Sequence, residues 1–178
     1  SGFVEIHATL HNPRAASHPG GLWDLGDPGS IYFKDFSLYL PFLSQNQPRI
    51  VCSTELSKPS CDSSAEHLEI YQASSGGENW RSTNHVNRFG EVSLQFQGYR
   101  VTENDKLVEG GRRSTPVLSL RSERHGLSAT IAKFWQNFPK AIEAHGREVV
   151  VRLFPGQFRD LFELQGGEQK THTLYLCF

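Results

Sequence analysis

The sequence predicts an all-β fold, a single antiparallel β-sandwich domain with little or no helix over residues 1–178. Short segments alternate apolar and polar residues with a period of two, and clusters of Gly, Pro, Asn and Ser separate them. This combination is typical of sandwiches and barrels, because successive side chains of a strand point to opposite faces of its sheet. The length of 178 residues suits one domain.

Six segments show the alternation clearly, and we expect each to be a strand. They are residues 3–10, 36–40, 68–71, 92–97, 149–153 and 174–178. The two longest polar stretches, residues 53–66 and 102–114, are expected to be exposed loops between strands.

Residues 127–138 carry two competing patterns. Ile131, Phe134, Trp135 and Phe138 are spaced as on one face of a helix. Pro139 follows at once, however, and a proline inside a helix removes a hydrogen bond and clashes with the preceding turn, at a cost of about 3 kcal/mol. We therefore expect a strand through residues 127–138.

Composition limits the classes of function. The net charge of −1 and the pI of about 6.7 include no basic surplus, so we expect neither a nucleic-acid partner nor an anionic membrane partner. No apolar run approaches the ~20 residues that span a bilayer. The first residue, Ser1, the absence of methionine and the strand-like final residues favour a domain excised from a longer multidomain protein.

The cysteines and histidines do not predict a metal site. Cys52, Cys61 and Cys177 lack the close spacing of metal-binding cysteines. Cys52 and Cys61 either close a short disulfide loop or remain free thiols, and the sequence leaves both alternatives open. His7 and His11 are four residues apart, which in the expected strand separates them by about 13 Å along the chain.

The densest group of reactive side chains lies in residues 11–30. Two prolines and four glycines between residues 18 and 29 exclude regular structure, so we expect a shaped loop. Arg14, His18 and Trp23 suit sugar binding, with the indole stacking on the ring and the guanidinium holding a uronate carboxylate. The alternative is structural, with Trp23 closing the end of the core and Asp24 and Asp27 capping tight turns.

Two further segments have a similar character. In residues 71–85 a Gly-Gly turn precedes Trp80, Arg81 and His85, and the Ser-Ser-Gly-Gly run matches no phosphate-binding motif. Trp80 either binds a ligand or belongs to the core. In residues 163–172, Lys170 and His172 alternate with Glu168 so that all three point to one face of a strand. That face either serves proton transfer and carboxylate binding or is an ordinary solvated surface.

Together these segments resemble the central β-sandwich domain of exo-rhamnogalacturonan lyase-like (YetA-like) proteins. The resemblance runs in order through nearly the whole chain. It covers residues 12–14, 18–30, 72, 74–80, 84–85, 134–140 and 163–172.

The resemblance implies one part of a three-part protein, in which a small barrel, this sandwich and an α/α toroid together act on the pectin backbone by β-elimination. It implies an acidic polysaccharide and the other domains of the parent chain as partners, and it implies that this domain alone is inactive. No cofactor is implied for this domain, and calcium is a candidate only in the parent protein. We expect a secreted or periplasmic location rather than a cytoplasmic one.

β-Elimination requires a cation that neutralises the uronate carboxylate and groups that transfer protons. On the matching segments we expect Arg14 and Lys170 to neutralise the carboxylate, and His18 and His85 to act as acid and base. The remaining expected substrate-binding residues are Trp23, Trp80, Arg81 and His172.

Two other functions fit the same sequence. A non-catalytic carbohydrate-binding module would expose Trp23 and Trp80 as a flat stacking platform. A scaffold or interaction sandwich would bind no sugar. Exposed tryptophans favour the module, and a basic cleft with covered tryptophans favours the lyase component.

Overall fold

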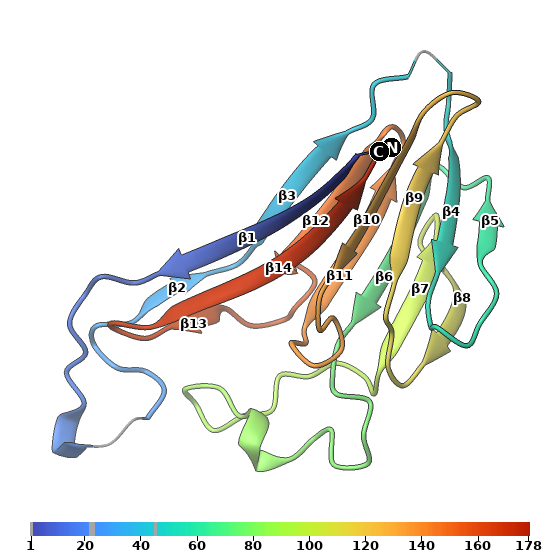
Figure 1. Ribbon diagram of the computed structural model, residues 1–178. Coiled ribbons are helices and arrows are strands. Elements are labelled where there is room, and N and C mark those ends of the chain that lie inside the picture. Colours follow the sequence, from blue (N-terminus) through green and yellow to red (C-terminus); the bar gives the residue numbers. More distant parts are fainter. Residues whose placement is uncertain (1, 22–23, 45) are drawn as a thin grey trace.

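Two long strands, β1 (Phe3–His11) and β14 (Gln169–Cys177), form one edge of the first sheet. They pair antiparallel from Phe3↔Cys177 to His11↔Gln169, as the alternation at both ends of the sequence predicts. In the computed structural model, which describes residues 2–21, 24–44 and 46–178, this sheet has six strands in the order β1-β14-β10-β9-β4-β5 (Figure 1). The other members are β10 (Gly126–Ile131), β9 (Val117–Arg121), β4 (Arg49–Ser53) and β5 (Cys61–Ser63).

The second sheet also has six antiparallel strands, in the order β3-β12-β11-β6-β7-β8. Its strands are β3 (Phe36–Pro41), β12 (Glu148–Phe154), β11 (Lys140–His145), β6 (His67–Gln72), β7 (Tyr99–Glu103) and β8 (Lys106–Gly111). The two sheets pack as a sandwich, which confirms the predicted fold class.

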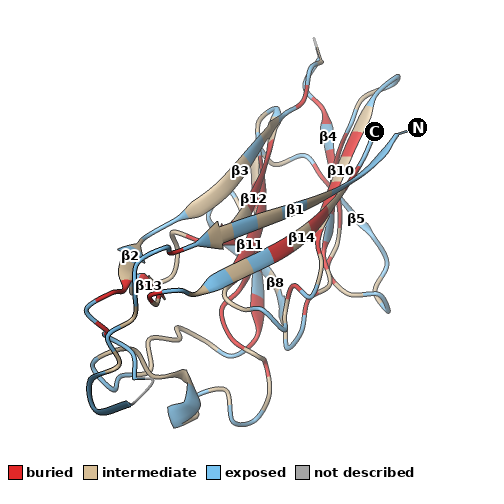
Figure 2. Ribbon diagram, turned by 60° about the vertical axis from the view of Figure 1, so that its left-hand side comes forward, coloured by how far each residue is buried: buried red, intermediate tan, exposed pale blue. Residues whose placement is uncertain are grey.

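The core lies between the sheets and consists of the inward-facing residues of the central strands. Ile70, Leu120, Ile142, Val151 and Leu174 are fully buried there. Figure 2 shows the same distribution: buried positions gather on the central strands, while β1, β5 and the loops at the lower end are largely exposed or intermediate. Burial of apolar side chains at about 25 cal/mol per Å² is the main force that holds the sheets together.

Short elements close the lower end of the sandwich in Figure 1. A two-stranded ribbon joins β2 (Ile31–Phe33) to β13 (Phe162–Leu164). Two three-residue 3-10 turns, η1 (Pro19–Gly21) and η2 (Thr83–His85), are the helical segments of the described chain. None of the helical segments in these described ranges is long and apolar enough to cross a membrane.

The strand expected over residues 127–138 is shorter than predicted. β10 ends at Ile131, and residues 132–137 form a turn that is neither helix nor strand. Lys133 has a positive φ of 53°, and its carbonyl accepts a hydrogen bond from the Asn137 N–H at 2.9 Å. The turn buries Phe134 in the core, so the apolar residues serve packing without regular structure.

Three other expectations about local structure need correction. Residues 92–97 make only an isolated bridge, Val86↔Val92, and Phe96 instead packs edge-to-face on Tyr71. The stretch 102–114 contains the β7–β8 hairpin, whose turn residues Asn104 and Asp105 both have positive φ, as tight hairpin turns require. The stretch 53–66 includes β5.

Of the two alternatives for the cysteines, the disulfide is present. Cys52 and Cys61 lie opposite each other on β4 and β5, with their Cα atoms 5.3 Å apart, and they are bonded. Cys177 is free and exposed.

Candidate functional site

A pocket of about 520 Å³ opens at the lower end of the sandwich, where β10 turns away from β14. We call it the lysine pocket. Its lining residues are His85, Gln136, Asn137, Phe138, Pro139, Lys140, Phe154, Phe162, Lys170, Thr171 and His172. The lining contains two lysines and two histidines but no carboxylate, so the pocket attracts anions.

Lys140 is the most unusual residue of this pocket. It is the first residue of β11, and its side chain is only 2% exposed. The ammonium group donates to the carbonyl oxygens of Leu153 and, at 3.4 Å, Pro139, and Nζ lies 5.0 Å from the centroid of the Phe154 ring. Burial, assisted by the charge of Lys170, lowers the pKa of Lys140 to about 7.

His172 also contacts Phe154. Its ring packs edge-to-face on the Phe154 ring, with centroids 5.0 Å apart, and only 8% of the residue is exposed. Burial, together with the charges of Lys140 and Lys170, lowers the pKa of His172 to about 4, so the imidazole is neutral at pH 7. Among the described residues, its buried Nε2 atom has no hydrogen-bond partner.

Lys170 and His172 confirm the predicted alternation along β14, but on an unexpected face. Both side chains point to the inner side of the sheet, where Leu174 and Leu176 continue the row into the core. Lys170 stays half-buried, and its Nζ lies 3.0 Å from Glu168 Oε1. The face is therefore the wall of a pocket and not a solvated surface.

His85 enters the lysine pocket from η2. The hydroxyl of Ser82 caps this turn by accepting the Asn84 N–H at 3.2 Å. The imidazole packs edge-to-face on Phe138, with ring centroids 5.2 Å apart. His85 thus lines the same pocket as Lys170 and His172 of β14, and its role in proton transfer stays a prediction.

A second pocket of about 200 Å³ adjoins the first and shares His85, Pro139, Phe162 and Lys170 with it. We call it the mixed pocket, because its remaining polar lining includes both signs of charge: Asn87, Arg88, Ser93, Asp160 and Glu163. These groups are already engaged with one another or with backbone.

Asp160 and Glu163 organise the mixed pocket. Asp160 Oδ2 accepts from the Asn87 amide at 2.5 Å and from the Ser93 hydroxyl at 3.2 Å. Burial acts to raise the pKa of Asp160, but the hydrogen bonds from Asn87, Leu161 and Ser93 outweigh it and leave the pKa below its ordinary value. Glu163 Oε1 accepts from the Gly26 N–H and the Ser30 hydroxyl, both at 2.7 Å.

Arg14 and His18, the described residues among those predicted in the 11–30 loop, are not part of the lining of the lysine pocket. The Arg14 side chain is exposed, and His18 lies 3.8 Å from Asp27 within the same loop. Asp27 is buried and accepts the backbone N–H groups of Ser17, His18 and Gly29. Burial acts to raise the pKa of Asp27, but these donors hold it below its ordinary value. The alternative in which Asp27 caps turns is confirmed for this residue.

The predicted stacking platform is only partly visible. Trp23 lies outside the described residues. Trp80 is half-buried, and the guanidinium of its neighbour Arg81 lies over its ring, 4.5 Å from the centroid. One face of the Trp80 ring is therefore covered by Arg81.

Sequence reasoning missed two groups of buried charges. Lys140 stands at the start of a strand directly after Pro139, where nothing in a single sequence marks it as buried. Glu69 and Glu143 lie on the outer face of the second sheet, where the Gln157 amide donates to both carboxylates and Arg152 pairs with Glu143. The signal for this pair in the sequence was that each of the two acids stands within an otherwise apolar strand segment.

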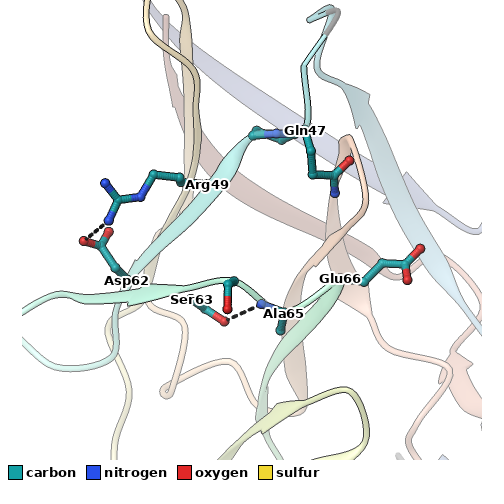
Figure 3. Close-up of a pocket in the computed structure, with 8 residues that line it drawn as sticks. Gln47, Arg49, Asp62, Ser63, Ala65 and Glu66 are labelled. Carbon is teal, nitrogen blue, oxygen red and sulfur yellow. Dashed lines mark hydrogen bonds and ion pairs between the residues drawn. The ribbon is translucent and has the colours of Figure 1, made fainter.

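A larger hollow of about 600 Å³ lies at the opposite end of the sheets, between β4, β5 and the segment before β6 (Figure 3). Its charged groups are Arg49, Asp62 and Glu66. Arg49 and Asp62 are mostly exposed and pair with each other at 2.7 Å. None of these charged groups is buried as Lys140 is in the lysine pocket, so we do not assign this hollow a function.

No protein-family model, curated protein or solved structure matches the chain. Within the described ranges no group of three or more His, Cys, Asp or Glu side chains is arranged to hold a metal ion.

Proposed function

We propose that this chain is the β-sandwich domain of a rhamnogalacturonan lyase-like protein and that its lysine pocket binds the carboxylate of a uronic acid unit. The observation that carries the proposal is the lining of the pocket, in which Lys140, Lys170 and His172 meet and no carboxylate takes part. Glu168, which is not part of this lining, pairs with Lys170 at 3.0 Å, and a uronate carboxylate would have to compete with it. A carboxylate that enters such a pocket gains charge-assisted hydrogen bonds in a partly desolvated site.

The adjoining mixed pocket supports a polymeric ligand in which charged and neutral sugar units alternate. A charged sugar in the lysine pocket places its neutral neighbour beside Asn87, Ser93 and Asp160, whose amide, hydroxyl and carboxylate groups suit sugar hydroxyls. Phe162 lies between the two pockets and belongs to both. The pectin backbone, in which galacturonic acid alternates with rhamnose, has this sequence of charges.

The residues of the lysine pocket fit the chemical demands of β-elimination. Lys170 neutralises the uronate carboxylate, which makes the neighbouring carbon-bound proton more acidic. His85 exchanges a proton with the sugar, and His172, neutral at pH 7, offers Nε2 to a sugar hydroxyl. Arg14 and His18, which lie in another loop, are less well placed for these roles.

A carbohydrate-binding module is the second candidate. It requires an open aromatic platform, and the guanidinium of Arg81 covers one face of Trp80. The lysine pocket therefore supports the lyase component better than the stacking module.

Calorimetric titration of the chain with rhamnogalacturonan oligosaccharides tests the proposal. Their reducing ends are first converted to alditols, so that only non-covalent binding is measured. We expect binding that weakens about tenfold or more in Lys170→Gln, because one charge-assisted hydrogen bond is worth about 1.5–3 kcal/mol. Lys106→Gln, on the exposed hairpin strand β8, is the matched control and keeps the affinity.

Neutral oligosaccharides of the same length provide the second control and are expected not to bind. Binding that survives Lys170→Gln but disappears in Arg14→Ala moves the uronate site to the 11–30 loop. Absence of binding to every oligosaccharide leaves this domain as a scaffold and refutes the proposal.

A further inference from the structure

Within the part of the chain that the structure describes, Lys140 is buried without the acidic partner that a buried ammonium group normally has. A charged group removed from water is usually paired with an opposite charge. The recorded acceptors of Lys140 Nζ are two backbone carbonyl oxygens, those of Leu153 and Pro139. Among the described groups, the charge that lowers the pKa of Lys140 is that of another cation, Lys170.

The contacts of Nζ accommodate a neutral amine. A neutral amine has two N–H donors, which match the two carbonyl acceptors, and it keeps one lone pair. An ammonium ion has three N–H donors, and its further contact is the face of the Phe154 ring, 5.0 Å from Nζ, in place of an acidic group. The lone pair is what makes a lysine nucleophilic, and desolvation beside a second cation is the arrangement that activates it.

We propose that Lys140 is a carbonyl-reactive lysine, and that the lysine pocket captures aldehydes carrying a carboxylate, such as the open-chain form of a free uronic acid, as an imine. Lys140 supplies the nitrogen, and Lys170, in the lining of the same pocket, holds the carboxylate. This activity is separate from the binding of an internal uronate unit, which has no free aldehyde.

The reaction is balanced without any further reagent. The nitrogen lone pair forms a bond to the aldehyde carbon while the C=O π electrons move to oxygen. The two protons of the amine leave with that oxygen as water, and a C=N double bond remains. Because only the neutral amine reacts, the rate is expected to fall as the pH drops below about 7, the pKa to which burial and Lys170 lower Lys140.

The experiment traps the imine on the intact chain. The protein is incubated with succinic semialdehyde and sodium cyanoborohydride, which reduces an imine to a stable secondary amine, and the modified lysines are located by peptide mass spectrometry. We expect Lys140 to react at least roughly tenfold faster than the exposed Lys133 of the neighbouring turn, because burial beside Lys170 favours the neutral, nucleophilic form of Lys140.

Butanal, which has the same chain length without the carboxylate, tests the ligand class. Lys140 should prefer succinic semialdehyde, and Lys170→Gln should remove the preference. Lys140→Arg keeps a cation but cannot form an imine, and Lys133→Arg is its matched control. Since the wild-type map alone compares the lysines, the test does not depend on the folding of a Lys140 variant.

Two outcomes overturn the proposal. If Lys140 reacts no faster than Lys133, it is a structural lysine. If it reacts fast but equally with both aldehydes, carboxylated aldehydes are not its ligand class. Neither result bears on the titration with alditol-ended oligosaccharides, so failure here is distinguishable from failure of the proposed binding function.

Discussion

Glu69 and Glu143 stand directly opposite each other on β6 and β11, with both carboxylates accepting from the same Gln157 amide nitrogen. Like charges in directly opposed positions of a sheet repel each other. Arg152 pairs with Glu143, whereas Glu69 has no ion pair of its own among the recorded contacts of the described chain. The neutral Gln157 amide thus bridges the two carboxylates, and Glu69 takes up a proton easily.

This arrangement predicts a stability that depends on pH. Burial raises the pKa of Glu69 to about 6, with Gln157 opposing the rise and Glu143 adding to it. A raised carboxyl pKa means that stability is lost as pH rises from the ordinary value of 4.5 through 6. At 1.36 kcal/mol per pKa unit the loss is about 2 kcal/mol. Glu69→Gln should remove this pH dependence, because an amide does not titrate. The amide oxygen still accepts the hydrogen bond from Gln157.

Urea denaturation of both proteins at pH 4.5 and pH 7 measures the effect. Glu66→Gln, an exposed residue of the same region, should behave as the wild type. An unchanged pH dependence in Glu69→Gln would show that other groups cause it.

Lys140→Met should stabilise the protein. The folded-state pKa of Lys140, about 7, is below its ordinary value of 10.5, so the cost of burying the ammonium is fully present below pH 7 and declines as pH rises towards 10.5. The gain in the unfolding free energy should be about 2 kcal/mol larger at pH 6.5 than at pH 8.5. Chemical denaturation at the two pH values measures this difference, and an equal gain at both would place the pKa of Lys140 elsewhere.

Loss of the disulfide should destabilise the fold moderately. Cys52 and Cys61 are nine residues apart, so the bond restricts a short loop of the unfolded chain. Replacing both by alanine should lower the unfolding free energy by about 2–3 kcal/mol. Cys177→Ser is the control, since this cysteine is free and exposed. Equal melting temperatures for the double variant and the wild type would contradict the expectation.

Alanine substitutions at two glycines with similar backbone angles can separate the cost of a strained backbone from the cost of a steric clash. Gly76 and Gly90 both have positive φ, at 70° and 77°. A Cβ atom on Gly76 would lie 1.9 Å from the Arg112 carbonyl oxygen, whereas one on Gly90 meets nothing within 4 Å. Gly90→Ala should cost about 1 kcal/mol, and Gly76→Ala at least about 2 kcal/mol more. Similar losses for the two variants, measured by thermal unfolding, would mean that the loop at Gly76 adapts.

The sequence predicted the fold class because period-two alternation is a local property. It could place Lys170 and His172 on one face of a strand for the same reason. It could not say that this face points to the core, since that depends on the second sheet, whose Phe154 packs on His172. Lys140 was missed on the same grounds, because the residues that bury it, including Phe154, are remote in sequence.

The two histidines predicted to transfer protons, His18 and His85, lie in different parts of the structure. His85 lies in the lysine pocket beside Lys170 and His172. His18 lies in the loop that Asp27 organises, and this loop was expected to form part of the same site. A single sequence does not show which loops lie next to each other in space. The order of the motifs therefore could not separate His85, which lies in the pocket, from His18, which does not.

The two halves of β14 differ in their neighbours, and the difference has a dynamic consequence. Residues Leu174 to Cys177 lie between β1 and β10, while the half with Lys170 and His172 pairs with β1 alone among the described strands. Opening of the backbone should therefore cost less free energy at Lys170 and His172 than at Leu174 and Leu176. Amide hydrogen exchange should be faster in that half of the strand, and a ligand in the lysine pocket should slow it there first.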